Sequence, residues 1–253
     1  MQATGDDRVR PPSVRGSWPG RVTLRSGWAR AVARPYNDDL PDAGLRLDRG
    51  SAAFLAASAA WLLDQGCATV HSPPLMEGGA RVWRQAGFVD GRILAIMERD
   101  LRRAVGAPLH AVRAGRRDEW GACAAIDRAA FPVTWRVGVL GLRDAAEATG
   151  SSRLFLVDSG GSPVGFAIAG TSFQTAYLQR IAVHPDHRGA GIGRSLVRAA
   201  VSWARCNQAR TILLNTQIDN QVAATLYRSE GFVEGREALH VLRHPADQSR
   251  EPT

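Results

Sequence analysis

A glycine-rich connector between an apolar segment and an amphipathic segment most constrains how this chain can fold. Residues 181–193 read Ile-Ala-Val-His-Pro-Asp-His-Arg-Gly-Ala-Gly-Ile-Gly, which places Gly189, Gly191 and Gly193 at alternate positions. The preceding residues are typical of a strand, and residues 194–205 carry apolar side chains at helical spacing. Such a loop can turn backbone N–H groups toward one point, and a helix N-terminus adds partial positive charge. The pattern predicts a strand–loop–helix unit that binds a phosphate or diphosphate.

Several kinds of loop could account for this glycine pattern. A Walker A loop requires a lysine, and all 32 basic residues of the chain are arginine. A Rossmann loop requires GxGxxG directly after the strand, whereas here the spacing is GxGxG and Pro185 lies in the connector. Asn215 could replace the acidic residue that binds a ribose, so the dinucleotide alternative stays open. A structural turn without a ligand is a further alternative.

Length, charge and cysteine content limit the classes of protein to which the chain can belong. A chain of 253 residues with 45% hydrophobic residues can form one large domain or two small ones. No apolar run approaches the roughly 18 residues of a membrane span, and the first residues lack a secretory signal. The sparse cysteines have no metal-ligand spacing, which predicts reduced thiols in the cytoplasm and no metal site. The formal charge is +8, but the arginines are scattered without aromatic residues between them, which argues against nucleic-acid binding. A homodimer remains open.

An internal repeat organises the chain. The segment Gly87-Phe-Val-x-Gly-Arg92 recurs as Gly231-Phe-Val-x-Gly-Arg236, 144 positions later. Both copies are predicted to read helix, strand, helix, strand, strand, which indicates a duplication. The predicted divisions are a disordered tail at 1–20, a truncated half at 21–106, a complete unit at 107–244 and a flexible tail at 245–253.

The complete unit predicts an α/β fold with a mixed sheet flanked by helices. Pro132 ends one predicted helix, and Gly231 ends another. Ser159-Gly-Gly-Ser162 predicts a hairpin turn between two strands. Strands are expected at 109–113, 154–158, 164–169, 177–183 and 211–215 and near 232 and 239–242, and helices at 118–131, 140–149, 194–205 and 221–229.

Two motifs in this unit resemble the GCN5-related N-acetyltransferases (GNAT family). Arg188-Gly-Ala-Gly-Ile-Gly193 is similar to the family's Arg/Gln-x-x-Gly-x-Gly/Ala loop. Asp219-Asn220-x-x-Ala-x-x-Leu-Tyr227-x-x-x-Gly-Phe232 is similar to a later helix-and-strand motif of the family. The resemblance covers residues 109–243. It implies the acyl-CoA N-acyltransferase fold, in which a mostly antiparallel sheet contains two parallel strands that splay apart.

The resemblance also implies acetyl-CoA as the acetyl donor. Strand residues near Ile181 would pair with the pantetheine arm through their backbone, and the glycine loop would hold the diphosphate. Asn220 would reach the pantetheine, or it is simply a helix cap. The implied cofactor site consists of Ile181, Ala182, Val183, Arg188, Gly189, Ala190, Gly191, Ile192, Gly193, Arg194, Asn220 and Tyr227.

Tyr227 is the predicted catalytic residue. An amine attacks the thioester, CoA leaves as a thiolate, and a phenol nearby can donate a proton to it. The alternative is a core aromatic residue. No base stands out, because His184 and His187 read as solvated loop residues. An α-amine, with a pKa near 8, would therefore be an easier acceptor than a lysine amine with a pKa near 10.4.

The acceptor side is expected at the early helices of the unit. Phe131, Trp135 and Gln174 are the candidate substrate-binding residues, with core packing as the alternative for the two aromatic residues.

The first copy is predicted to lack a cofactor site. At the offset of 144, the glycine loop falls on residues 44–49, Asn220 on Met76 and Tyr227 on Trp83. The sequence thus predicts one active unit that transfers acetyl groups directly to a primary amine of a small molecule or peptide N-terminus in a ternary complex. The alternatives are a non-catalytic CoA-binding sensor or scaffold and a dinucleotide-binding oxidoreductase.

Overall fold

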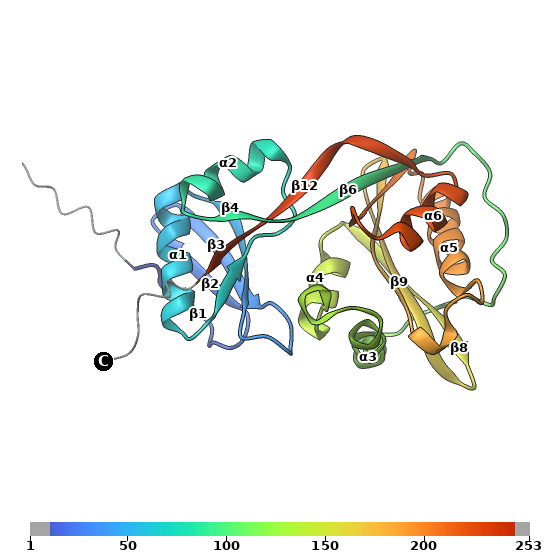
Figure 1. Ribbon diagram of the computed structural model, residues 1–253, viewed down its shortest axis with the longest axis horizontal. Coiled ribbons are helices and arrows are strands. Elements are labelled where there is room, and N and C mark those ends of the chain that lie inside the picture. Colours follow the sequence, from blue (N-terminus) through green and yellow to red (C-terminus); the bar gives the residue numbers. More distant parts are fainter. Residues whose placement is uncertain (1–10, 246–253) are drawn as a thin grey trace, which may run out of the picture. The chain divides into compact units, whose positions relative to one another are not determined.

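The computed structural model describes residues 11–245 and divides the chain into two compact units (Figure 1). The first unit combines the residues up to Arg92 with those from His240 onward, and the second is Ile93–Leu239. Two long strands, β6 (Val89–Asp100) and β12 (Val233–Pro245), therefore contribute residues to both units. No helix within the described residues is long and apolar enough to cross a membrane.

The first unit is a sheet covered by two helices. Its strands follow the order β1-β2-β3-β4-β5-β12, with β4 and β5 parallel and the other neighbours antiparallel. Leu24, Leu45, Leu55 and Leu62 are buried in its core. Its further elements are β1 (Ser13–Arg15), β2 (Val22–Ser26), β3 (Ala29–Pro35), β4 (Ala43–Arg49), α1 (Ala52–Asp64), β5 (Thr69–His71) and α2 (Glu77–Gln85).

The expected disorder of residues 1–20 is wrong for the part that the structure describes. Ser13–Arg15 forms β1 and pairs with β2, with Val14 opposite Leu24. Val14 and Trp18 pack against the core of the first unit, and this burial holds the segment. Residues 1–10 lie outside the described part, as do residues 246–253 of the expected C-terminal tail.

The second unit has the predicted α/β fold, with helices on both faces of a mostly antiparallel sheet. Figure 1 shows α5 and α6 on one face and α3 and α4 on the other, and each face has its own apolar core. The strand order is β6-β11-β10-β9-β8-β7, in which only β10 and β11 run parallel. Its helices and strands are β7 (Arg113–Ala114), α3 (Trp120–Ala130), α4 (Val139–Glu147), β8 (Ser151–Ser159), β9 (Ser162–Ser172), β10 (Thr175–Val183), α5 (Ile192–Cys206), β11 (Thr211–Gln217) and α6 (Gln221–Ser229).

Local sequence signals account for most of these boundaries. Gly160 and Gly161 form the two-residue turn between β8 and β9 with φ values of +59° and +80°, a conformation suited to glycine. Asn220 caps α6, and Gly231 follows it with φ +85°. On α5, Leu196, Ala200 and Ala204 are buried, as their helical spacing predicts.

The repeat is visible in the structure, and the two copies exchange their last strands. Helix α2 and strand β6 recur as α6 and β12, each beginning 144 positions later. Strand β6 pairs antiparallel with β11, from Leu94 with Gln217 to Asp100 with Thr211. Strand β12 pairs antiparallel with β5, from His71 with Arg243 to Thr69 with Pro245. The sheet of each unit is therefore completed by the strand that follows the last helix of the other copy.

This exchange places the division of the chain elsewhere than our predicted boundary at 106/107. Each copy also ends in one long strand, whereas two strands were expected. A local pattern cannot distinguish these cases, because hydrogen bonding to a distant strand decides where a strand ends.

The offset of 144 positions does not hold for the residues that precede the first helix of each copy. Residues 44–49 belong to strand β4 and do not form a loop. The connector from β4 to α1 consists of Gly50 and Ser51 alone, and Ser51 caps α1. The equivalent connector in the second unit runs through residues 184–191. The first copy thus lacks the segment that would carry a glycine loop.

Candidate active site

The two parallel strands of the second unit separate along their length. Strands β10 and β11 pair from Thr175 with Thr211 to Leu178 with Leu214. Beyond this point β10 stays paired with β9 and β11 with β6. A register shift in β10 between Leu178 and Arg180 marks where the separation starts. This is the splayed arrangement that the resemblance implied.

The splayed end of β10 carries the predicted pantetheine residues. Ile181, Ala182 and Val183 pair with β9 only, so the side of β10 toward β11 has no strand partner there. An extended ligand could add to such an edge by backbone hydrogen bonds.

The glycine loop leads from this edge into α5. Gly189 and Gly191 have φ values of +78° and +84°, which favour glycine, and the space at the Cβ position of Gly189 is open. Gly191 is the N-cap of α5 and supplies no capping side chain, so within residues 11–245 the first N–H groups of the helix have no side-chain cap. Ala190 lies between the two turns. The loop has the shape of an anion-binding site.

Gly193 also has a role in packing. A Cβ atom there would lie 3.3 Å from Leu226 Cδ2 and 3.8 Å from Val183 Cγ2. The absent side chain therefore lets α6 and β10 pack closely against α5, and the role of this glycine toward a phosphate stays a prediction.

An upstream segment, 109–110, is attached to the same loop. Ser195 Oγ accepts hydrogen bonds from the N–H groups of Leu109 (3.0 Å) and His110 (3.1 Å) and donates to the carbonyl of Gly191 (3.1 Å). His110 Nε2 lies 2.6 Å from the carbonyl oxygen of Ala190. The predicted strand at 109–113 is wrong, since only Arg113–Ala114 forms one. A single serine on a helix gave no sequence signal for this contact.

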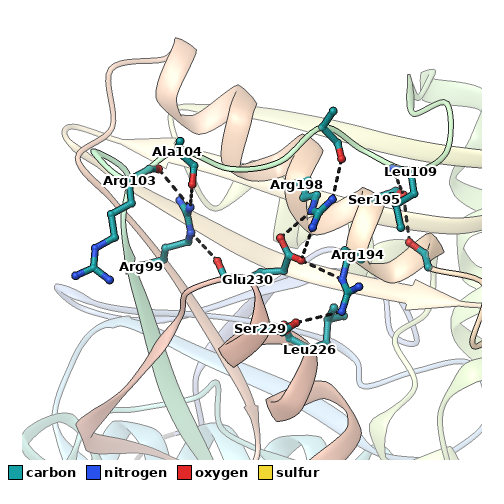
Figure 2. A network of polar contacts seen from close by, with 12 residues as sticks. Arg99, Arg103, Ala104, Leu109, Arg194, Ser195, Arg198, Leu226, Ser229 and Glu230 are labelled. Carbon is teal, nitrogen blue, oxygen red and sulfur yellow. Dashed lines mark hydrogen bonds and ion pairs between the residues drawn. The ribbon is translucent and has the colours of Figure 1, made fainter.

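The arginine side chains of the loop are held by protein groups. Arg188 Nη2 donates to the carbonyl of Ala130 at the end of α3 (2.7 Å). Arg194 Nε lies 3.0 Å from Glu230 Oε1, and Arg194 Nη2 is 3.3 Å from Ser229 Oγ (Figure 2). The two side chains fix the loop to α3 and α6. The backbone N–H of Arg188 donates to the carbonyl of Pro185 (3.1 Å), so of these two residues only Arg194 could offer its backbone N–H to an anion.

The C-terminal end of α6 is the centre of a buried polar network (Figure 2). Glu230, whose side chain is 5% exposed, also accepts two hydrogen bonds from Arg198 (2.9 and 3.1 Å). Arg99 of β6 donates through Nε to the carbonyl oxygen of Glu230 (2.7 Å). The helix that carries Tyr227 is thereby tied to α5 and to the exchanged strand.

Tyr227 lies on α6 in the core between the helix and the sheet. Its ring packs against Phe232, with centroids 5.9 Å apart, and burial raises the pKa of the phenol to about 12. The positive charge of Arg180 acts in the opposite direction on this pKa. No group among the described residues hydrogen-bonds the hydroxyl. Tyr227 is thus buried, and its proton is retained at neutral pH.

Asn220 caps α6, and its contact with the pantetheine stays a prediction. Its Oδ1 accepts a hydrogen bond from the N–H of Ala223 (3.1 Å). The capping bond fixes the start of α6 after β11.

The expected acceptor side is partly assembled. Phe131 and Trp135 both contact Arg180 of β10: the guanidinium lies 4.0 Å from the Phe131 ring centroid and donates to the Trp135 carbonyl (2.8 Å). Arg180 Nε donates to Asp127 of α3 (2.6 Å). Sequence reasoning missed Arg180 and Asp127, because 53 residues separate them.

Gln174 does not belong to this group. It precedes β10 at the end where the strand is still paired with β11, and its carbonyl accepts from the N–H of Arg210. The strands separate at the opposite end of β10, so the structure does not bring Gln174 together with Phe131 and Trp135, and its role at the acceptor site stays a prediction.

Comparisons with known proteins agree with this geometry. A model of the acetyltransferase (GNAT) family matches residues 120–232. The N-alpha-acetyltransferase RimI of Mycobacterium tuberculosis is 33% identical over 106 residues, which are 36% of this chain and 65% of that protein. The [ribosomal protein bS18]-alanine N-acetyltransferase of Escherichia coli is 32% identical over 97 residues, 38% of this chain and 64% of that protein. Streptothricin acetyltransferase of E. coli is 40% identical over 60 residues, 24% of this chain and 34% of that protein. The matches thus span between about a third and two thirds of these relatives.

Solved structures share the fold over most of the chain. A putative GNAT acetyltransferase of Novosphingobium aromaticivorans superposes with a TM-score of 0.60 at 19% identity and covers 89% of this chain and 92% of that one. A tandem GNAT protein from the clavulanic acid biosynthesis pathway has a TM-score of 0.59 at 17% identity, covering 95% and 86%. These identities establish the fold alone. The match to the acetyltransferase (GNAT) family model covers residues 120–232, within the second unit, and the splayed strands agree with it.

Proposed function

We propose that the second unit transfers an acetyl group from acetyl-CoA to a primary amine. The observation that carries this proposal is the separation of β10 and β11, which opens toward the uncapped start of α5 on one side and toward α6 with Tyr227 on the other. Three free cysteines suit a reducing compartment, and we place the protein in the cytoplasm.

The residues present fit acetyl-CoA. The backbone edge of Ile181–Val183 would pair with the pantetheine amides, and the N–H groups from Gly189 to Arg194 would bind the diphosphate. Open space at the Cβ position of Gly189 leaves that backbone accessible. Acetyl-CoA would supply an activated thioester.

Tyr227 would act as the proton donor. Burial keeps the phenol protonated, and the same dry surroundings would raise the basicity of the departing thiolate. The charge of Arg180 would stabilise negative charge on the phenol oxygen as its proton is transferred. A direct attack by the amine needs no acetylated enzyme intermediate, and no cysteine lies in either motif.

The names of two relatives support an α-amine as the acceptor. One is named as an N-alpha-acetyltransferase and the other as an alanine N-acetyltransferase. The lower pKa of an α-amine, near 8, also reduces the need for a strong base.

Binding and turnover can be tested separately. Acetyl-CoA at about 100 times its Kd should stabilise the protein by about 2.7 kcal/mol, whereas NAD(H) should not. Gly191→Glu should abolish this shift, because it places bulk and negative charge where the diphosphate is bound. Thiol release across a panel of amines then reports turnover, in a Cys206→Ser background because Cys206 is the exposed thiol.

Tyr227→Phe separates the enzyme from a CoA-binding sensor. We expect kcat to fall by about a hundredfold or more while acetyl-CoA affinity is kept, because only the proton donor is lost. Loss of affinity with unchanged kcat would contradict the acid role. Binding of acetyl-CoA without thiol release from any amine would favour the sensor.

A further inference from the structure

A single arginine stands where the two parallel strands separate, on the face that the proposed acceptor would use. Leu178, Ile181 and Val183 of β10 pack toward α5, whereas Ala182 belongs to the core beneath α3 and α4. Arg180 follows the register shift of β10 and reaches Asp127 of α3. Its side chain thus lies on the α3 face of the sheet.

The guanidinium is fixed by groups from three directions. Asp127 is fully buried, accepting from Arg180 Nε (2.6 Å) with one oxygen and from the N–H of Val137 (2.7 Å) with the other. The carbonyl of Trp135 accepts from Arg180 Nη2 (2.8 Å), and the Phe131 ring covers the guanidinium plane. A planar donor held in this way loses little conformational entropy when it binds a further group.

One nitrogen of this guanidinium remains available. Nη1 has no hydrogen-bond partner among the described residues, and it is absent from the buried side-chain atoms that lack partners, so solvent reaches it. The side chain as a whole is 17% exposed. By contrast, Arg194 and Arg198 of the same unit are both paired with Glu230. The charge of Arg180 also reaches the other side of the strand opening, where it acts on Tyr227.

We propose that Arg180 binds a carboxylate of the acceptor, so that the preferred substrates are primary amines that carry a carboxylate, such as free amino acids. The inference rests on the proposed acetyl transfer and names the substrate class of that site. Asp127 already balances one unit of charge, so a singly charged carboxylate fits better than a doubly charged phosphate. A peptide N-terminus, which carries a neutral amide at the same position, would not use this contact.

The alternative is that the Asp127–Arg180 pair only ties α3 to the sheet. Removing Arg180 would then impair all amines alike. The carboxylate role predicts a selective loss instead, which the ratio of kcat/KM for an amino acid to that for its carboxamide measures. Comparing this ratio between variants cancels the different intrinsic reactivity of the two amines.

The test uses the full chain, acetyl-CoA, and the common amino acids paired with their carboxamides. In Arg180→Met we expect the carboxylate-to-amide ratio to fall about ten- to a hundredfold, mainly through KM, because a hydrogen bond to a charged group is lost. The ratio for Arg180→Lys should lie between those of the wild type and Arg180→Met, since lysine keeps the positive charge but lacks the planar set of donors. Arg153→Met, which makes the same charge change at an exposed position of β8, should leave the ratio unchanged.

Two further measurements keep the outcome decisive. The double variant Asp127→Asn/Arg180→Met leaves no buried unpaired carboxylate. It replaces Arg180→Met in the test if that single variant does not fold. Calorimetry on the CoA-loaded protein reads the preference for amino acid over carboxamide without turnover, so a failed acetyl transfer is distinguished from a failed carboxylate contact. The inference is overturned if the carboxylate-to-amide ratio is the same in the wild type and in either Arg180 variant. It is also overturned if the wild type prefers carboxamides and peptides.

Discussion

At the scale of single residues, Tyr227 is held between two opposing influences. Desolvation raises the pKa of its phenol, and the nearby charge of Arg180 lowers it. Burial is the larger of the two, so the hydroxyl keeps its proton well above neutral pH. This is the state that a proton donor to a thiolate requires.

The chain has three tyrosines, and this makes the ionisation of Tyr227 measurable. An absorbance titration of the native protein should show one tyrosine ionising near pH 12, above the ordinary value of about 10. Tyr227→Phe should remove the step near pH 12. A variant that keeps this step would contradict the burial of Tyr227.

The same shift predicts how stability changes in alkali. The folded state retains the Tyr227 proton between pH 10 and 12, where the unfolded state has lost it, so the contribution is complete below pH 10 and is lost as pH rises toward 12. The loss amounts to about 2 to 3 kcal/mol. Cys67 and Cys123, whose pKa values burial raises to about 11 and about 12, act in the same sense. The difference in urea midpoint between wild type and Tyr227→Phe, followed from pH 9 upward, isolates the tyrosine.

At the scale of elements, α6 is positioned by polar contacts at both ends. Asn220 caps its start, and Arg99 and Glu230 hold its end against β6 and α5. Arg99 is 4% exposed, and its Nη2 also donates to the carbonyls of Arg103 and Ala104. The position of Tyr227 therefore depends on β6, the last strand of the first copy.

Arg99→Met should destabilise the protein by about 2 to 3 kcal/mol, because buried carbonyl groups lose a charged donor. Arg102→Met is the matched control, since Arg102 lies nearby with its side chain 88% exposed and, among the described residues, pairs with Asp100 alone. We expect the control to change stability by less than about 1 kcal/mol. Urea unfolding of both variants measures the difference in the free energy of unfolding. Equal losses of stability would show that the contact of Arg99 with the end of α6 is unimportant.

At the scale of the whole molecule, the exchanged strands make the two copies depend on each other. A fragment of residues 107–253 lacks β6, so β11 loses its antiparallel partner from Thr211 to Gln217. An unpaired strand edge with its apolar face uncovered favours aggregation. The first copy has a structural role even though it lacks a glycine loop.

We expect the fragment 107–253 to be unfolded or aggregated, as judged by circular dichroism and by the absence of an acetyl-CoA thermal shift. A fragment that begins at residue 89 restores β6 and should recover more of the native signal. Co-expression of 1–106 with 107–253 should restore binding, because the two pieces then supply both exchanged strands. A folded 107–253 that binds acetyl-CoA as the full chain does would contradict the exchange.

The sequence by itself determined the local elements and the identity of the fold. The glycine turns, the Asn220 cap and the apolar spacing of α5 depend on neighbours within a few residues, so they can be read from the chain. The repeat at 144 positions likewise indicated that one helix and the strand after it recur in the second half of the chain. These features follow from local backbone conformation and periodicity.

Only the tertiary structure decided which distant groups meet. It paired β6 with β11, brought Arg180 to Asp127, placed residues 109–110 on Ser195, and assigned Gly193 to helix packing. Each of these depends on hydrogen bonds, ion pairs or contact distances between residues far apart in sequence, and such contacts leave no periodic trace in the chain. For the same reason, the contacts of Arg180 with Asp127 and Trp135 became visible only in the folded second unit.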